Sequence, residues 1–268
     1  MSESGSILPA YFIPHGGGPC FFMEWDPPDT WTVMEEWLRD LGSRVKPKAI
    51  VVISGHWEED AFCATSNPHP SLIYDYHGFP PQTYEIEYPA PGSPALASEI
   101  NSLLKKAGLP SRLDPQRGFD HGVFIPFKVM YPKADIPIVQ LSLHESLDPE
   151  THIRAGRALQ SLRAQNVLIA GSGMSYHNLR KFMGGDGFNE ASVEFDDWLT
   201  KAVCAPDAKT RNRELCRWEE APAAREAHPR EEHLIPLMVA VGAAGHDRGE
   251  KVYADRVMGA ALSAYKFT

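Results

Sequence analysis

Five histidines stand in settings where an imidazole could do chemistry. His15 follows the apolar run AYFIP and precedes three glycines, His56 ends AIVVISGH, and His177 follows NVLIAGSGMSY. His121 and His233 each come directly before an apolar stretch. Imidazole is the commonest side-chain ligand of transition metals, and it can also move protons near neutral pH. These residues therefore point to a metal site, an acid–base site or both.

Each of these histidines also has an ordinary structural interpretation. A histidine beside glycine at a strand end is a common turn residue, and His121 and His233 could be helix caps or half-buried side chains. A shared site is favoured by the common setting of His15, His56 and His177, since each follows a buried strand and has small neighbours. The remaining histidines lack such a setting and are expected to be structural: His69, His77, His144, His152, His228 and His246.

The string PHGGGP also matches the oxyanion-hole loop of some esterases. That interpretation requires a nucleophile elbow, G-x-S-x-G, after a strand. The nearest strings are GSGMS at 171–175 and ISG at 53–55, and neither has serine between glycines at both required positions. A hydrolase is thus the weaker hypothesis. We expect glycines 16–18 to let the backbone turn where a side chain would crowd a metal or a substrate.

Four apolar runs predict the strands that position these histidines. They are rich in valine and isoleucine and nearly continuous, which is typical of strands covered on both faces of a sheet. They span residues 10–13, 49–54, 136–143 and 166–172. Ligands of open α/β sheets bind at the carboxyl ends of the strands. Three strands would thus bring His15, His56 and His177 to one edge.

Helices are predicted between and after these strands. Amphipathic stretches cover residues 31–45, 93–109, 148–165 and 191–204, and a continuous apolar stretch at 234–244 predicts a buried helix. Strands that alternate with helices indicate a layered α/β fold. We therefore expect a central, mostly parallel or mixed sheet flanked by helices, with the metal site at the strand carboxyl ends.

The organisation of the chain favours a single domain over residues 1–268. Residues 1–8 are expected to be a flexible N-terminus, and GGDG at 184–187 a plain turn. The segment 67–94 is dense in proline and aromatic residues, and long loops of this kind often form binding walls. Its aromatic side chains could line a pocket or simply pack locally: Tyr74, Tyr76, Phe79 and Tyr84.

Composition excludes several classes of function. The formal net charge is 26 − 35 = −9 without a block of basic residues, which argues against nucleic-acid or anionic-membrane partners. The four cysteines form no CxxC pair, so a thiolate zinc site is not expected and the thiols indicate a reducing compartment. Neither a signal peptide nor a bilayer-spanning run is evident. We expect a cytoplasmic protein that acts on a small molecule.

Six motifs taken together resemble those of a known family. In chain order they are PHGGGP, ISGHWEE, YDYHGFPPQTYEIEYPAPGSP, GFDHGVFIPF, GSGMSYHNL and EEHLIPLMVAVGAAG. From about residue 9 to the C-terminus the chain resembles the aromatic ring-opening dioxygenases of the DOPA 4,5-dioxygenase type, which are class III extradiol dioxygenases. The resemblance is specific to that superfamily, but it does not identify one substrate.

The resemblance implies a non-haem metal held by His15, His56 and His233. The wider superfamily often uses two histidines and one carboxylate. Because Glu231 and Glu232 precede His233, either glutamate remains an alternative third ligand. Fe(II) is the expected metal and Zn(II) the second choice, since neutral imidazoles with open positions allow Fe(II) to bind catechol oxygens and O2 together.

The resemblance also implies roles for three further residues. His177 matches the acid–base histidine and is a potential fourth ligand, while His121 matches a second catalytic histidine that lines the substrate pocket together with Tyr176. The implied reaction opens the ring of a catechol with O2 and yields a muconic semialdehyde type product. A zinc-binding, non-oxidative or signalling member of the same fold is the alternative. A homodimer is the default expectation for a cytosolic enzyme.

Overall fold

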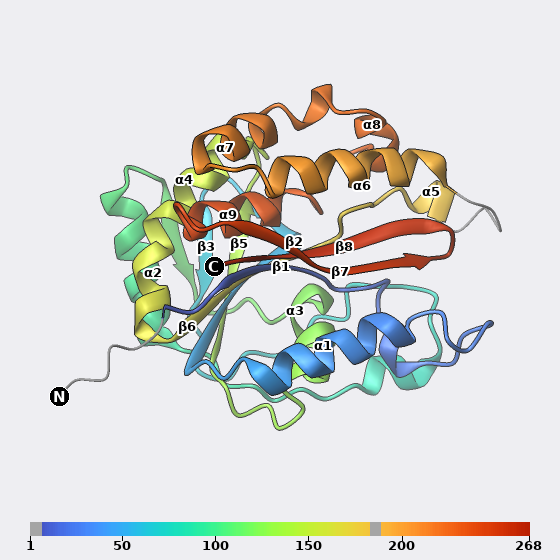
Figure 1. Ribbon diagram of the computed structural model, residues 1–268. Helices are drawn as coiled ribbons and strands as arrows, with labels where there is room; N and C mark the ends of the chain where they lie inside the picture. The colour runs from blue at the N-terminus through green and yellow to red at the C-terminus, as the bar shows by residue number, and fades with distance from the viewer. Residues whose placement is uncertain (1–6, 183–188) are drawn as a thin grey trace.

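The computed structural model describes residues 7–182 and 189–268, and its centre is a mixed eight-stranded sheet (Figure 1). Across the sheet the strand order is β4-β3-β5-β2-β6-β1-β8-β7. In chain order the strands are β1 (Ala10–Pro14), β2 (Ala49–Glu59), β3 (Phe62–Thr65), β4 (Ser111–Asp114), β5 (Ile138–His144), β6 (Val167–Gly173), β7 (Gly249–Val257) and β8 (Ala260–Phe267).

Two expectations fall wholly or mainly outside the described residues. The expected turn at 184–187 lies in the undescribed stretch, as do residues 1–6 of the expected flexible N-terminus. The described end of that N-terminal segment is attached to the sheet layer, because the backbone N–H of Leu8 donates to the carbonyl of Arg163 at 3.3 Å.

The four predicted strands are confirmed, and they form the centre of the sheet as β5-β2-β6-β1, all parallel. Each is almost wholly buried. The order places β6 between β1 and β2, so that Ile169 pairs with both Ala10 and Val51. The carboxyl ends of β1, β2 and β6 therefore meet at one edge, as the apolar runs predicted.

The four outer strands were not predicted. β7 mixes exposed, half-buried and buried residues, β3 and β4 are only four residues long, and Ser263 and Lys266 interrupt β8, so none gives a long continuous apolar run. β7 and β8 form an antiparallel hairpin whose turn residues, Met258 and Gly259, both have positive φ (49° and 82°). Such turns usually carry Asn-Gly or Asp-Gly. The absence of that signal explains why the hairpin was missed.

Helices cover both faces of the sheet (Figure 1). Their bounds are α1 (Thr32–Arg44), α2 (Pro94–Lys106), α3 (His121–Met130), α4 (Pro149–Leu159), α5 (Leu179–Phe182), α6 (Glu190–Val203), α7 (Ala208–Cys216), α8 (Ala224–Ala227) and α9 (Ile235–Ala244). The predicted helices correspond to α1, α2, α4, α6 and α9, although the α-helix expected over 148–165 ends at Leu159 and continues as a 3₁₀ helix. In the described parts of the chain, no helix has both the length and the apolarity to cross a membrane.

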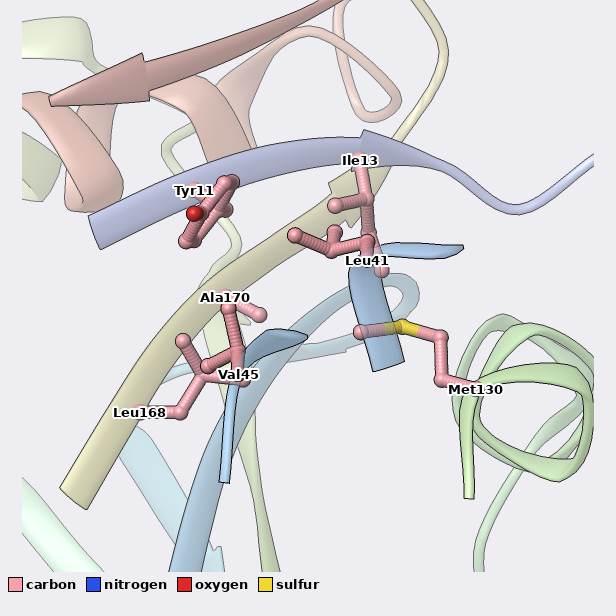
Figure 2. Close-up of a pocket in the computed structure, with 7 residues that line it drawn as sticks. All are labelled: Tyr11, Ile13, Leu41, Val45, Met130, Leu168 and Ala170. Atoms are coloured by element: carbon pink, nitrogen blue, oxygen red, sulfur yellow. The ribbon is translucent and has the colours of Figure 1, made fainter. Parts of the chain in front are cut away.

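Helices α1 and α3 pack side by side on one face of the sheet. Residues two apart in a strand face the same side of the sheet. Figure 2 shows one such pair from β1 and one from β6, which contact side chains from α1, from the residue that follows α1 and from α3. The residues are Tyr11, Ile13, Leu41, Val45, Met130, Leu168 and Ala170. Gly42 allows the two helices to touch, because a Cβ there would overlap the carbonyl of Met130.

Helix α9 is buried on all sides between the sheet and α4. Every one of its residues is buried, which is the pattern of a core helix. Glycine allows the close approach to α4: a Cβ on Gly156 would overlap the carbonyl of Val239, and one on Gly242 would overlap that of Ile153. The start of α9 is thus held against the strand edge where the histidines gather.

Candidate metal centre

Three of the five histidines reach the strand edge along the predicted routes. His15 directly follows β1, and its backbone N–H donates to the carbonyl of Gly173 at the end of β6 (3.2 Å). His177 lies four residues after β6, and His233 lies two residues before α9. His121 is the first residue of α3 rather than the residue before it.

The expectation that His56 ends its strand was wrong. β2 continues to Glu59, and its register with β5 shifts between Ile53 and Glu58. His56 lies inside this irregularity. Bulges of this kind redirect a side chain within a strand and are common beside active sites. The interrupted register lets His56 join the cluster although its strand does not stop there.

All five histidines come together in the structure. The ring centroid of His15 lies 4.9 Å from that of His56, 5.2 Å from that of His121 and 5.2 Å from that of His233. His177 stacks on His233 with centroids 3.4 Å apart and an interplanar angle of 17°. The Nε2 atoms of His56 and His233 are 3.2 Å apart. These side chains therefore face a common point.

The donor atoms of His15, His56 and His233 fit a transition metal. One ring nitrogen from each lies within 4.8 Å of the others. Nε2 of His15 is buried and has no hydrogen-bond partner in the described part of the chain, an arrangement that costs about 1–3 kcal/mol unless something else satisfies the atom. Two further groups meet the same distance test: His56 with Asp75 and His121, and His177 with Glu232 and His233.

The electrostatics of the three histidines also favour metal binding. Burial lowers the pKa of His15, His56 and His233 well below the ordinary histidine value, and the charges of neighbouring histidines lower each pKa further. The three rings are therefore neutral at pH 7. Because a metal binds only the unprotonated nitrogen of imidazole, no proton has to be displaced from these rings first.

Asp75 belongs to the site and was missed by the sequence analysis. Its Oδ1 accepts from the backbone N–H of His121 (3.1 Å) and lies 2.7 Å from Nδ1 of the same residue. Its Oδ2 lies 3.6 Å from Nδ1 of His56. Burial raises the pKa of Asp75, but the hydrogen bonds and charge of His121, with the charge of His56, outweigh burial and hold it at about 2. The one sequence feature that could have identified Asp75 is that it is a carboxylate within the proline- and aromatic-rich segment 67–94.

The two glutamates before His233 have different surroundings. Oε1 of Glu232 lies 2.9 Å from Nδ1 of His233 and 3.2 Å from Nδ1 of His177. Burial raises the pKa of Glu232, but its contacts with His177 outweigh burial and lower it. Glu231 instead pairs with Arg225 at 2.6 Å and belongs to none of the metal-capable groups among residues 7–182 and 189–268. Glu232 thus touches the outer side of both rings.

A buried network below the centre supports the irregular part of β2. The Ser54 hydroxyl accepts from the backbone N–H of His56 (3.2 Å) and donates to Asp120 (2.7 Å). Arg117 donates to Asp120 (3.2 Å) and to the carbonyl of His56 (3.3 Å), and Gln140 donates to Asp120 as well. Burial raises the pKa of Asp120. These bonds tie the backbone on both sides of His56 to the start of α3.

The expected backbone turn at the glycines after His15 is confirmed. Gly16 and Gly18 adopt positive φ (81° and 55°), which favours glycine. A Cβ on Gly16 would overlap Sγ of Cys20, and one on Gly18 would lie 2.9 Å from the ring of Phe79. The glycines therefore make room for the loop itself and for the aromatic loop. That they also leave room for a metal or a substrate stays a prediction.

The aromatic residues of segment 67–94 mainly pack against each other. The hydroxyl of Tyr74 donates to the carbonyl of Ile86 (2.8 Å), and that of Tyr76 donates to the carbonyl of Thr83 (2.5 Å). Of these rings, Tyr76 is the one with a described contact to the cluster, edge-on to His121 at 5.7 Å. Local packing therefore describes most of this loop.

Tyr176, expected to contact substrate, is only 1% exposed. Its hydroxyl accepts from the side-chain amide of Asn189 (2.6 Å), and its ring stacks on Phe182 with centroids 6.3 Å apart. A contact with substrate would need to reach past this packing, and the role remains a prediction.

The serines near the centre do not support a hydrolase. Ser172 is fully buried and its hydroxyl donates to the carbonyl of Gly122 (2.5 Å). Ser175 is 1% exposed, and its hydroxyl oxygen accepts from the backbone N–H of Ser263 (2.8 Å). Both hydroxyls are engaged with backbone groups and enclosed, so neither is presented as a nucleophile.

Comparison with known proteins identifies the family to which the chain is similar. The sequence profile of the family described as catalytic LigB subunit of aromatic ring-opening dioxygenase matches residues 9–265. The chain is 38% identical over 273 residues to 4,5-DOPA dioxygenase extradiol of Beta vulgaris, covering 100% of this chain and 99% of that protein. It is 37% identical over 285 residues to Dioxygenase tasH of Hapsidospora irregularis, covering 97% of this chain and 85% of that protein.

A solved structure shares the fold. The crystal structure of an uncharacterized protein from Escherichia coli K12 superimposes with a TM-score of 0.76 at 30% sequence identity. The match covers 97% of this chain and 99% of that one.

Proposed function

The chain belongs to the family of catalytic LigB subunits of aromatic ring-opening dioxygenases, and on that premise we propose that it opens catechols at a metal held by His15, His56 and His233. It is an extradiol ring-opening dioxygenase that uses O2 and an aromatic substrate. Dioxygenases of this family use a non-haem metal.

The observation that carries the proposal is the convergence of three neutral imidazoles on one point. His15 contributes an otherwise unpartnered buried Nε2, and the Nε2 atoms of His56 and His233 approach to 3.2 Å. Fe(II) is the proposed metal, with Zn(II) the alternative. When bound, Fe(II) supplies a Lewis acid for the catechol oxygens and a route for electrons between the ring and O2.

His177 is proposed to move protons at the substrate hydroxyl. Its ring lies against His233, its Nδ1 faces Glu232, and its side chain is 19% exposed, so its Nε2 is free to meet a ligand. Histidine is the residue most often used for such transfers near neutral pH, which contribute about 10²–10⁴-fold to rate. Glu232 holds the ring in place while the proton is exchanged at Nε2.

His121 is proposed to hydrogen-bond the substrate. Asp75 fixes both its backbone N–H and its Nδ1, which leaves Nε2 directed toward the other histidines. A catechol in front of the centre would place its hydroxyls between His121 and His177. The ring edge of Tyr76 beside His121 would add an apolar contact to the substrate ring.

The proposed substrate is a catechol of the DOPA type, and the proposed product is a muconic semialdehyde type compound. The name of the Beta vulgaris relative supports this choice of substrate class. A carboxylated catechol, a plain catechol and an aminophenol suit the same chemistry. The cytoplasmic location and the homodimer expected from the sequence remain predictions.

The test is anaerobic reconstitution with Fe(II), followed by oxygen-electrode measurements with DOPA, protocatechuate, catechol and an aminophenol. Oxygen uptake that requires both Fe(II) and a catechol is the expected result. His177→Ala should keep metal binding and lower turnover by about 10²–10⁴-fold. Tight Zn(II) binding with no oxygen uptake would instead favour the non-oxidative or signalling alternative.

A further inference from the structure

Two carboxylates contact the outer nitrogens of four histidines in a repeated pattern. Asp75 lies beside Nδ1 of His121 (2.7 Å) and Nδ1 of His56 (3.6 Å). Glu232 lies beside Nδ1 of His233 (2.9 Å) and Nδ1 of His177 (3.2 Å). Each carboxylate therefore links one proposed metal ligand with one histidine proposed to act on the substrate.

The fifth histidine follows the same rule without a carboxylate. Nδ1 of His15 lies 2.9 Å from the carbonyl oxygen of Gly16, which can only accept a hydrogen bond. Four of the five rings thus hold Nδ1 within 3.2 Å of an acceptor oxygen. Nδ1 of His56 faces Oδ2 of Asp75 at 3.6 Å, so there the carboxylate acts through its charge rather than through a hydrogen bond. A neutral imidazole carries one proton, so an acceptor beside Nδ1 selects the form protonated there and leaves the Nε2 lone pair free.

We propose that Asp75 and Glu232 are positioning residues that fix the ring tautomers of His56, His121, His177 and His233, so that every ring presents an unprotonated Nε2 to the centre. The Nε2 atoms of His56 and His233, 3.2 Å apart, then face each other as lone pairs, an arrangement that a metal between them would satisfy. The inference rests on the proposed function for the ligand set, but the tautomers themselves are properties of the metal-free protein. Partners of this kind orient metal-binding histidines in general, and their loss costs about 10–100-fold in metal affinity.

The two carboxylates do this work in different ways. Asp75 uses both oxygens: Oδ1 serves the backbone N–H and the ring of His121, and Oδ2 faces His56. Glu232 uses Oε1 for both of its histidines. Its Oε2 is buried without a hydrogen-bond partner among the described residues, and Nη1 of Arg230 lies 3.6 Å away.

This difference predicts opposite outcomes for the same chemical change. In Asp75→Asn the amide oxygen must stay with the two donors of His121, so the NH2 group faces Nδ1 of His56. His56 then becomes an acceptor at Nδ1 and carries its proton on Nε2, where it can no longer bind metal. Zn(II) affinity should fall by about 10–100-fold while the tautomer of His121 is retained.

Glu232→Gln should spare the tautomers. The amide oxygen can replace Oε1 and accept from both His233 and His177. The NH2 group takes the place of Oε2, which has no hydrogen-bond partner among the described residues, and the cost is the distant ion pair with Arg230 at 3.6 Å. Zn(II) affinity should therefore fall less than the about 10-fold that marks loss of an orienting group. Glu232→Leu removes both oxygens, and it should lower Zn(II) affinity by about 10–100-fold.

The experiment uses the full chain labelled with ¹⁵N-histidine and freed of metal. Long-range ¹H–¹⁵N spectra report which ring nitrogen of each histidine carries the proton, and Zn(II) affinity is measured by competition with a chromophoric chelator. Glu231→Gln is the matched control, because Glu231 pairs with Arg225 and contacts no histidine of the cluster. Thermal unfolding of each variant shows whether it is folded.

The expected result is Nδ1–H at His56, His121, His177 and His233 in the wild type, with the proton moved to Nε2 at His56 in Asp75→Asn alone. Nε2–H rings in the folded wild type would overturn the proposal, as would an Asp75→Asn variant that binds Zn(II) like the wild type. If the tautomers are as expected but no catechol supports oxygen uptake, the proposed function fails while this inference stands.

Discussion

Helix α9 takes part in two regions of the molecule that differ in what they bury: one buries apolar side chains, and the other buries polar ones. Along its length it packs against α4, where apolar side chains and the glycines Gly156 and Gly242 bring two backbones into contact. Just before its first turn, His233 enters a partly buried cluster of five imidazoles and two carboxylates. The first region requires only matching shapes, whereas the second also requires a partner for each polar atom.

The comparison shows where stability and function diverge. Shape matching between α4 and α9 contributes to folding through a close approach of two backbones. The histidine cluster buries polar atoms that are costly to desolvate, and Nε2 of His15 has no partner among the described residues. A site that leaves a buried ring nitrogen without a partner is suited to binding a ligand and is not at its most stable when empty. The predictions below test this division.

The largest expected effect is that of His15→Ala on activity and metal binding. The variant loses one of three proposed ligands, so Fe(II)-dependent oxygen uptake should fall below detection. Wild-type protein at free Zn(II) of 100 times Kd should gain about 2.7 kcal/mol in free energy of unfolding, and the variant should gain almost none. Chemical denaturation of each protein with and without Zn(II) measures these two gains in free energy of unfolding. An equal gain in the two proteins would remove His15 from the ligand set.

Gly156→Ala should affect the other region alone. The new methyl group would overlap the carbonyl of Val239, and neither backbone can move without disturbing the other helix. The free energy of unfolding should fall by about 1–3 kcal/mol. This loss is expected even though alanine favours a helix over glycine by about 1 kcal/mol. Denaturant unfolding checks this, and Zn(II) affinity should stay unchanged.

The control for that comparison is Arg157→Ala, which changes the next residue of the same helix on its exposed side. Its free energy of unfolding should stay within about 0.5 kcal/mol of the wild type. A Gly156→Ala protein that also loses Zn(II) would show that the two regions are coupled through α9.

The smallest expected effect separates a structural histidine from the cluster. Burial lowers the pKa of His152 to about 4. Because the folded pKa lies below the unfolded value of about 6.5, the unfolded state binds more protons, and stability is lost as the pH falls from about 6.5 toward 4. His152→Gln should reduce this slope by at most about 1.4 kcal/mol per pH unit.

Urea unfolding of the metal-free variant and wild type between pH 7 and pH 4 measures that slope. The remaining slope should reflect His228 and the cluster histidines, whose pKa values are also lowered by burial. Identical slopes in the two proteins would mean that His152 does not bind a proton on unfolding in this range.

The central part of the fold could be predicted because its signals are local. β1, β2, β5 and β6 are continuous apolar runs, and α9 is apolar on every side, so short windows of sequence were sufficient. The β7–β8 hairpin was missed because its strands mix polar and apolar residues and its turn contains Met258. His152 and His228 were expected to be structural, and the structure adds that both are fully buried.

At the candidate site, residue types were predictable and partners were not. The five clustered histidines were all identified from their settings, but the bulge that carries His56 depends on pairing with β5 and on the network around Asp120. Asp75 carries no motif of its own. It gains its role because the aromatic loop folds back over the start of α3.

The sequence by itself determined the kinds of atoms available for chemistry and the strands that carry them, since side-chain identity and hydrophobic period are properties of neighbouring residues. Only the tertiary structure decided which nitrogen of each ring faces the centre. That choice depends on acceptors such as Asp75, which is 46 residues from His121 along the chain. A hydrogen bond across that separation exists only after the loop and the helix have packed together, so no local pattern could encode it.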